Sequence, residues 1–172
     1  WVLVLNEEDG VGAELPLAQS GVPCALAADA SLAAGTQGIG WNFFDKGVAI
    51  QLQAHALGAP DGQGTVDTRV WDEFLGLCRS YRPQRPFDSI VLSVPASVLL
   101  ASDAQSRADL VARARQIHRR LWLAQNRFAL RFPVFVVVSG CEAIAGFSAL
   151  ASALPDSMRR SMLGWSSPHE LS

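Results

Sequence analysis

The sequence is poor in lysine, and this scarcity excludes an ordinary phosphate-binding loop. Lys46 is the single lysine, and the other 13 of the 14 strongly basic residues are arginines. A Walker loop needs a lysine in a glycine-rich turn that opens a helix, where it neutralises the phosphate oxygens. Lys46 does not lie near such a turn. The sequence therefore cannot supply a complete Walker loop.

Cysteine is also scarce. Cys24, Cys78 and Cys141 lie far apart in the sequence. An odd, unclustered set argues against a disulfide framework and against a zinc site. We expect three small, mostly buried thiols in a reducing compartment.

Charge and long apolar runs are limited as well. Charged residues make up 17% of the chain, below the roughly 25% of an average soluble domain, and the net charge is −2. This balance gives no basic field for nucleic acid. No signal peptide is visible, and no run approaches the about 18 apolar residues of a membrane helix. The low charge indicates either a domain that uses part of its surface for partners or one cut from a larger membrane-associated protein. Because the chain opens at Trp1 inside an apolar run, we expect residues 1–172 to be a one-domain fragment.

Apolar runs and helical periodicity alternate along the chain. Residues 22–40 and 53–65 read as loops. Strands are expected at 1–6, 41–44, 47–52, 87–96 and 131–140, and "FPVFVVV" in the last of them reads as a buried strand. Helices are expected at 14–20, from a cap at Thr65 or Asp67 to about 81, from Ser102 or Asp103 to about Gln125, at 142–154 and near 156–163. This alternation predicts an α/β domain with a mostly parallel sheet and helices on both faces.

The two longest helices have contrasting faces. The first should bury Val70, Phe74, Leu75 and Cys78, and the second has an apolar stripe at Leu110, Val111, Ala114, Ile117 and Leu121. Arginines cover the other faces of the second helix. They are Arg107, Arg113, Arg115, Arg119, Arg120 and Arg127. They form either a solvated face or a basic patch that binds a partner.

The stretch "LNEEDGVGAEL" (5–15) has the position and glycine spacing of a phosphate-binding loop, through Gly10 and Gly12. The lysine position is Ala13 and the Ser/Thr position is Glu14, so the groups that contact phosphate and Mg²⁺ are missing. Glu7, Glu8 and Asp9 add negative charge. One carboxylate about 5 Å from a phosphate charge costs roughly 3 kcal/mol at an effective dielectric near 20. Either a solvated loop or a divalent cation site fits these acids better than a triphosphate site.

Two other strand ends belong to the same argument, because sites in parallel sheets lie at the carboxyl ends of strands. The second end has Gln51, a poor Mg²⁺ ligand, followed by His55, which could orient a water or simply be an exposed loop residue. The third is "SGCEA". Gly140 follows Ser139 where a guanine-reading loop has its lysine, and Glu142 is either the acid of that loop or a first-turn helix residue. His118 and His169 have no partner that the sequence identifies.

Several longer stretches resemble the cytoplasmic domain of the IcmF/TssM proteins, the large inner-membrane subunits of type VI secretion systems. The resemblance runs along nearly the whole chain. It is carried by "WVLVLNEEDGVGAELPLAQSG", "GTQGIGWNFFDKGVAI", "VWDEFLGLCRSYRPQRPFDSIVLSVPASVLL", "RFPVFVVVSGCEAIAGF" and "SMLGWSSP". The fourth resembles the family's "RFPVYVLFTKCDLIAGF" almost position by position.

The resemblance implies a Ras-like P-loop NTPase fold, and this chain departs from it at the functional positions. The first Walker glycine is Glu7, the lysine is Ala13 and the threonine is Glu14. Thr36 matches the family's "GT". The "DTAG" element falls on residues 51–54 and the "TKCD" element on residues 139–142. These departures put nucleotide hydrolysis in doubt.

The resulting expectation is a pseudo-GTPase domain with no catalytic residues, cofactor or metal, which acts as a docking module. The resemblance implies a place on the cytoplasmic face of the bacterial inner membrane, TssL as membrane partner, and TssK, TssG or TssA as baseplate partners. One alternative is an altered site that binds or hydrolyses GTP or ATP, with an arginine in place of the lysine. Another is an unrelated α/β domain, or a cation switch that uses Glu7, Glu8 and Asp9.

Overall fold

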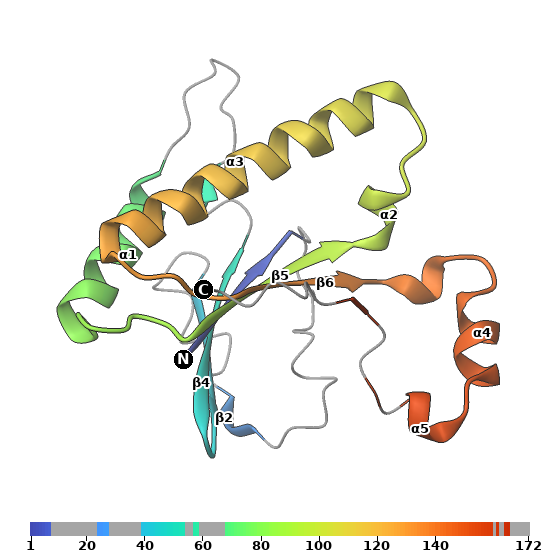
Figure 1. The fold of residues 1–172 in the computed structure, drawn as a ribbon, viewed down its shortest axis with the longest axis horizontal. Coiled ribbons are helices and arrows are strands. Elements are labelled where there is room, and N and C mark those ends of the chain that lie inside the picture. Colours follow the sequence, from blue (N-terminus) through green and yellow to red (C-terminus); the bar gives the residue numbers. More distant parts are fainter. Residues whose placement is uncertain are drawn as a thin grey trace.

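The structure, a computed structural model, is an α/β domain built on a six-stranded mixed sheet (Figure 1). It describes residues 1–7, 24–27, 39–53, 57–58, 68–159, 161 and 164–165; for residues 24–27 and 53 the description covers the backbone. The strand order is β2-β3-β4-β1-β5-β6. The expected helix at 14–20 lies outside the described residues.

The parallel half of the sheet is centred on β1 (Val2–Asn6), which pairs with β4 (Gly47–Gln53) and β5 (Ser89–Pro95). The last strand, β6 (Val134–Ser139), pairs in parallel with β5. These are the apolar runs from which strands were predicted, so that part of the prediction is confirmed. Because all four strands run the same way, their carboxyl ends meet at one edge of the sheet.

The other half of the sheet is antiparallel. β3 (Ile39–Phe44) and β4 form a hairpin around the turn at Asp45-Lys46, as predicted. β2 (Cys24–Ala27) pairs antiparallel to β3 within the range predicted to be a loop, so the loop prediction for 22–40 is wrong there. A four-residue strand has too little sequence for an alternating pattern to stand out, and its partner strand decides its conformation.

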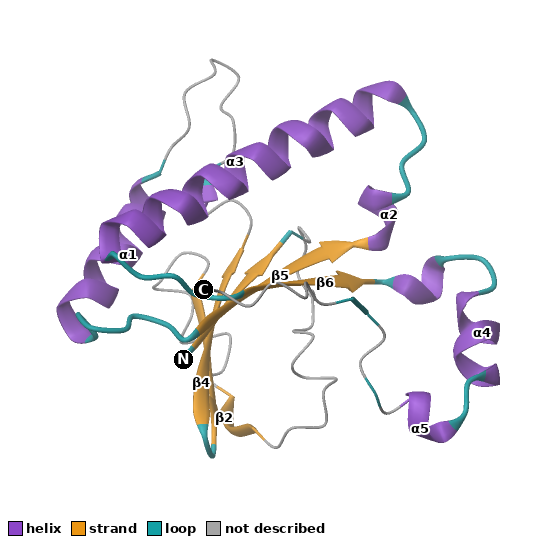
Figure 2. Ribbon diagram, in the orientation of Figure 1, coloured by secondary structure: helices purple, strands orange, loops and turns teal. Residues whose placement is uncertain are grey.

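A helix layer covers one face of the sheet (Figure 2). α1 (Arg69–Tyr81) and α3 (Ala104–Phe128) join the central strands in a single buried cluster, which includes Leu3, Leu5 and Ile90. α2 (Ala96–Leu99) buries Ala96, whereas α4 (Phe147–Ala153) and α5 (Asp156–Arg159) bury no residue. In the described part of the chain, the prediction of helices on both faces is therefore met on one face only.

α1 forms because its apolar residues recur at helical spacing, and Trp71, Phe74, Leu75 and Cys78 are buried. Val70, which was expected on this face, is only half-buried. The cap residue is Thr68 rather than Thr65 or Asp67, and its hydroxyl donates to the Asp72 carboxylate at 2.7 Å. The aromatic rings of Phe74 and Phe87 stack at 6.5 Å within the cluster.

α3 begins after Asp103, one of the two predicted start residues, and the Asp103 carboxylate accepts a hydrogen bond of 2.7 Å from the backbone N–H of Ser106. The helix ends at Phe128, followed by Ala129 in the left-handed conformation with φ 52°. Ile117 and Leu121 of the predicted stripe are buried, together with Ala124. Val111 is instead exposed, so the stripe is covered only along the C-terminal half of the helix.

β6 forms where it was predicted, but the prediction that it is buried is wrong. Its residues Val134–Val138 are all exposed, with Val136 at 62%. β6 is the last strand in the sheet order, and none of its residues belongs to the core cluster. An apolar run of this length indicates a strand, whereas its burial depends on which layers lie against it.

The segment after β6 is less regular than predicted. The expected helix 142–154 is divided into a 3₁₀ turn, η4 (Cys141–Ala143), and α4. Gly146 has φ +83°, a conformation that favours glycine and interrupts the helix. The next helix, α5, covers four residues of the range expected near 156–163.

The described cysteines differ in their surroundings. Cys78 is buried in the core, and this burial raises the pKa of its thiol to about 11. Cys141 is partly exposed in η4, so the expectation of buried thiols holds for Cys78 only. The side chain of Cys24 lies outside the described residues.

The cap of α3 generates a pH prediction. The Ser106 backbone N–H holds the pKa of Asp103 below its usual value, so the capping stabilisation is present above the unfolded pKa of about 4 and is lost as pH falls through the folded pKa. Asp103→Ala should lower the melting temperature at pH 7, and the difference from the parent protein should disappear in strong acid. Asp103→Asn is the matched control, because asparagine caps without a titrating group. An Asp103→Ala deficit that persists unchanged in strong acid would contradict the assignment.

Candidate functional site

The carboxyl edge of the parallel strands brings together two of the predicted site regions. β1 ends at Asn6, and the backbone N–H of Glu7 continues its ladder by donating to the Ser93 carbonyl at 3.0 Å. β6 ends at Ser139, which pairs with Pro95 at the end of β5. Since β5 lies between β1 and β6, these two ends are about 10 Å apart, two strand spacings.

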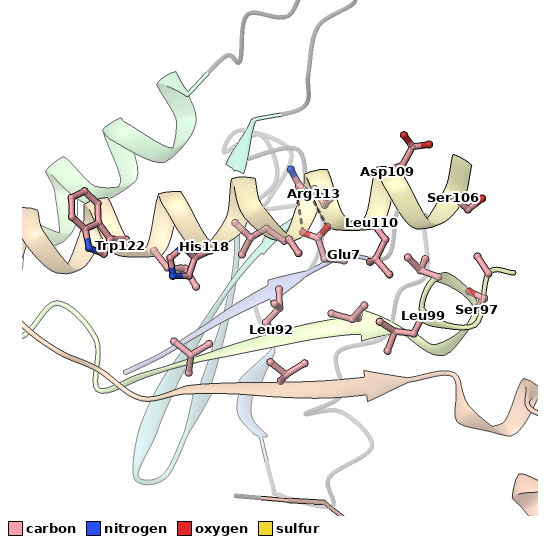
Figure 3. A pocket seen from close by; sticks show the side chains of 18 of the residues that line it. Glu7, Leu92, Ser97, Leu99, Ser106, Asp109, Leu110, Arg113, His118 and Trp122 are labelled. Carbon is pink, nitrogen blue, oxygen red and sulfur yellow. Dashed lines mark hydrogen bonds and ion pairs between the residues drawn. The ribbon is translucent and has the colours of Figure 1, made fainter. Parts of the chain in front are cut away.

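Glu7 forms a bidentate ion pair with Arg113 of α3 (Figure 3). Arg113 Nε lies 2.8 Å from Glu7 Oε2, and Nη2 lies 2.9 Å from Oε1. The side chains are 12% and 20% exposed, so the two charges are largely removed from water. Paired hydrogen bonds of this kind are the stronger class of ion-pair contact.

Arg113 also reaches a third segment. Its Nη1 donates to the Gly58 carbonyl at 2.9 Å and to Gln116 Oε1 at 3.1 Å, and the Gln116 amide donates to the same Gly58 carbonyl. One guanidinium group thus joins the end of β1, the turn at 57–58 and the long helix. The sequence offered Glu7 as an acid that repels phosphate, as part of a solvated loop, or as a ligand of a divalent cation, whereas the structure places the guanidinium group of Arg113 directly against it.

Sequence reasoning missed the role of Arg113, which it grouped with the solvent-facing arginines. Its position was a usable signal, because Arg113 lies four residues before Ile117 and next to Ala114, at the border of the apolar stripe. An arginine at such a border can extend toward the sheet. Which acid it meets depends on the packing of α3 over β1.

Residues 139–142, which the resemblance aligns with a base-reading loop, lead from the end of β6 into the 3₁₀ turn η4. Gly140 has φ +67° and begins η4, and Glu142 is exposed in that turn. Ser139 Oγ is buried without a hydrogen-bond partner among the described residues. Glu142 therefore has the place of a first-turn acid, which was one of its two interpretations.

Gln51 does not lie at the carboxyl end of a strand, where the sequence analysis placed it. Gln51 pairs with Val4 in β1 and Gly40 in β3, while β4 continues to Gln53. Gln51 thus lies inside a strand rather than at its carboxyl end, because the apolar pattern of β4 stops before its ladder does. Thr36 and His55 lie outside the described residues, as do Gly10, Gly12, Ala13 and Glu14 of the loop.

The described residues lack the features of a metal site and of a membrane span. They contain no group of three or more His, Cys, Asp or Glu side chains that could hold a metal ion. Among the described helices, none has the length and apolar character needed to cross a membrane. His118 is exposed on α3, away from the Glu7–Arg113 pair.

Comparisons with known proteins agree with each other. The sequence model of the IcmF-related N-terminal domain family matches residues 64–172. A type VI secretion system component, TssM1 of Pseudomonas aeruginosa, is 28% identical over 170 residues, which cover 95% of this chain and 15% of that relative. The chain therefore spans about a seventh of the length of this relative. No solved structure matches the chain.

The ion pair predicts a measurable coupling between β1 and α3. Arg113→Ala should lower the free energy of unfolding by about 2–3 kcal/mol, because it leaves the largely buried Glu7 carboxylate unpaired. Glu7→Gln and the double variant complete a cycle in which we expect a coupling of about 1–3 kcal/mol by urea unfolding.

Arg119→Ala is the control for this cycle. Arg119 is exposed on the same helix, so its removal should change stability by less than about 0.5 kcal/mol. Additive effects of Glu7→Gln and Arg113→Ala would show that the pair is not energetically coupled.

Proposed function

Because the chain belongs to the IcmF/TssM family of type VI secretion, we propose that it is a non-catalytic, pseudo-GTPase domain that acts as a structural docking module of the secretion membrane complex. The observation that carries the proposal is the Glu7–Arg113 pair. A carboxylate occupies the first glycine position of the Walker loop, and its partner is an arginine of α3.

The strand order supports a P-loop NTPase-like ancestry. Residues 7–14 follow β1 in the sequence, β1 lies between two parallel partners, and the antiparallel hairpin extends one side of the sheet. We propose that the fold is a degenerate GTPase-like domain on this basis and on the quoted family resemblance. The replacements Ala13 and Glu14 remove the groups that would neutralise phosphate and hold Mg²⁺.

The ion pair can replace a bound nucleotide as the structural connection between neighbouring elements. A bound nucleotide connects the loop after the first strand with neighbouring elements, and Arg113 makes such a connection through Glu7 and the Gly58 carbonyl. A permanent internal connection suits a domain that holds one shape for its partners. In this proposal the domain lies on the cytoplasmic face of the inner membrane and docks TssL and the baseplate subunits TssK, TssG or TssA.

One observation favours the alternative of an altered nucleotide site. Arg113 extends to the end of β1, the region where a phosphate-binding cation would be needed. An arginine that exchanged Glu7 for a phosphate would meet that need. The negative charges of Glu7, Glu8, Asp9 and Glu14 oppose this exchange, which is why the docking role is preferred.

Nucleotide titration decides between the two. Isothermal titration of the protein with GTP or ATP and Mg²⁺ should give no binding in the micromolar range, because roughly 3 kcal/mol of repulsion per nearby carboxylate offsets much of the about 8 kcal/mol that such affinity represents. The variant Glu7→Gly/Ala13→Lys/Glu14→Thr serves as the comparison and should bind more tightly than the parent. Micromolar binding by the parent that Arg113→Ala abolishes would instead establish the altered site.

A further inference from the structure

A long apolar groove lies between α3 and the outer strands of the sheet (Figure 3). Its volume is about 980 Å³. Leu92 and Val94 of β5 and Val134 and Val136 of β6 form its floor. The α3 residues that line it run from Ser106 to Gln125, which corresponds to about 28 Å of helix.

The groove contains residues whose exposure departs from the sequence-based expectations. Ala114 of the α3 stripe and Val134 and Val136 of β6 were expected to be buried, and all three are exposed. Leu110, Ala114, His118 and Trp122, each four residues apart, line the groove, and Trp122 is 56% exposed. An exposed tryptophan beside apolar strands is typical of interaction surfaces, in which Trp is enriched.

The length of the groove, about 28 Å, fits one α-helix of about five turns. The groove has a sheet floor and a helix as one wall, while the other side opens at β6, the edge strand. A helix laid beside α3 would bury its apolar face on the strands and on the α3 row. This is the helix-in-groove mode of recognition, with anchors at i, i+3, i+4 and i+7.

The charge of the rim indicates the chemistry of that helix. Beside the lining residues, α3 carries Arg107 and Arg115, both exposed, and no carboxylate among the described residues pairs with them. Two carboxylates line the groove, Asp109 and the Arg113-paired Glu7. α3 holds six arginines and a single carboxylate, Asp109. A second copy of this basic helix would be repelled, whereas glutamates on the flank of an amphipathic helix would be attracted.

We propose that the α3–β6 groove binds an amphipathic helix with an acidic flank from a partner protein. The helix places its apolar stripe on Val134, Val136 and the α3 row, and its carboxylates face Arg115 and the neighbouring arginines. This inference rests on the proposed docking function and gives it a location.

The test uses a designed peptide as the probe. A 20-residue peptide (about the length of the groove at 1.5 Å per residue) has leucines at helical spacing and glutamates on both flanks, and a second peptide has lysines in place of the glutamates. Fluorescence anisotropy should show binding of the acidic peptide, at least about tenfold weaker binding of the basic one, and loss of affinity at high salt. Amide shifts in the protein should map to α3 and β6.

Two variants with matched controls locate the site. Ala114→Trp fills the groove and should weaken acidic-peptide binding by at least about tenfold, whereas Ala112→Trp makes the same change at an exposed position on the opposite side of α3 and should not. Arg115→Glu should weaken the acidic peptide and strengthen the basic one, while Arg79→Glu on α1 should leave both unchanged. Circular dichroism verifies that each variant is folded.

Several results would overturn the proposal. The first is absence of acidic-peptide binding, the second is equal binding of both peptides, and the third is an equal effect of Ala114→Trp and Ala112→Trp. The fourth is sedimentation showing a dimer that Ala114→Trp dissolves, which would make a second copy the occupant. The peptide assay contains no nucleotide. Its failure therefore leaves the titration with GTP and ATP unchanged, and nucleotide binding would defeat the proposed function without altering the peptide result.

Discussion

The parallel pairing of β1 with β4 and β5 is the constraint on which the other features depend. Leu3 and Leu5 of β1 are fully buried under the helix layer, and the strand is bonded on both edges. Parallel strands require connections that cross the sheet, and these place α1 and α3 over the centre. The same direction of the strands brings Glu7 and the end of β6 to one edge.

At that edge the chain makes an internal contact between two distant segments. The guanidinium of Arg113 compensates the negative charge of Glu7 through two hydrogen bonds. A largely buried carboxylate is costly unless it is paired in this way. The pair also connects the end of β1 to α3, so the placement of this helix and the charge at the end of β1 belong together.

The helix layer covers the sheet unevenly. α1 and the C-terminal half of α3 pack over β1, β4 and the start of β5, where most of the buried cluster of the described residues lies. β6 lacks an equivalent cover in the described part of the chain, and Val134–Val138 are exposed, whereas Ser93–Pro95 of the neighbouring β5 are buried. A stable centre and an open apolar flank suit a domain that contributes surface to an assembly, as we propose for this member of the IcmF/TssM family.

Sequence alone determined the strands at β1, β3–β6, the two main helices and the cap at Asp103, because continuous apolar runs, helical spacing and a capping carboxylate are local signals. It also identified the family, through "RFPVFVVVSGCEAIAGF". Separately, it showed that the lysine of a Walker loop is absent. Tertiary structure alone decided that β2 is a strand, that Gln51 lies inside β4, that Arg113 meets Glu7 across 106 positions of sequence, and that β6 is exposed. These features depend on which segments lie beside each other, and neither residue spacing nor composition specifies which layer of the fold covers a given apolar residue.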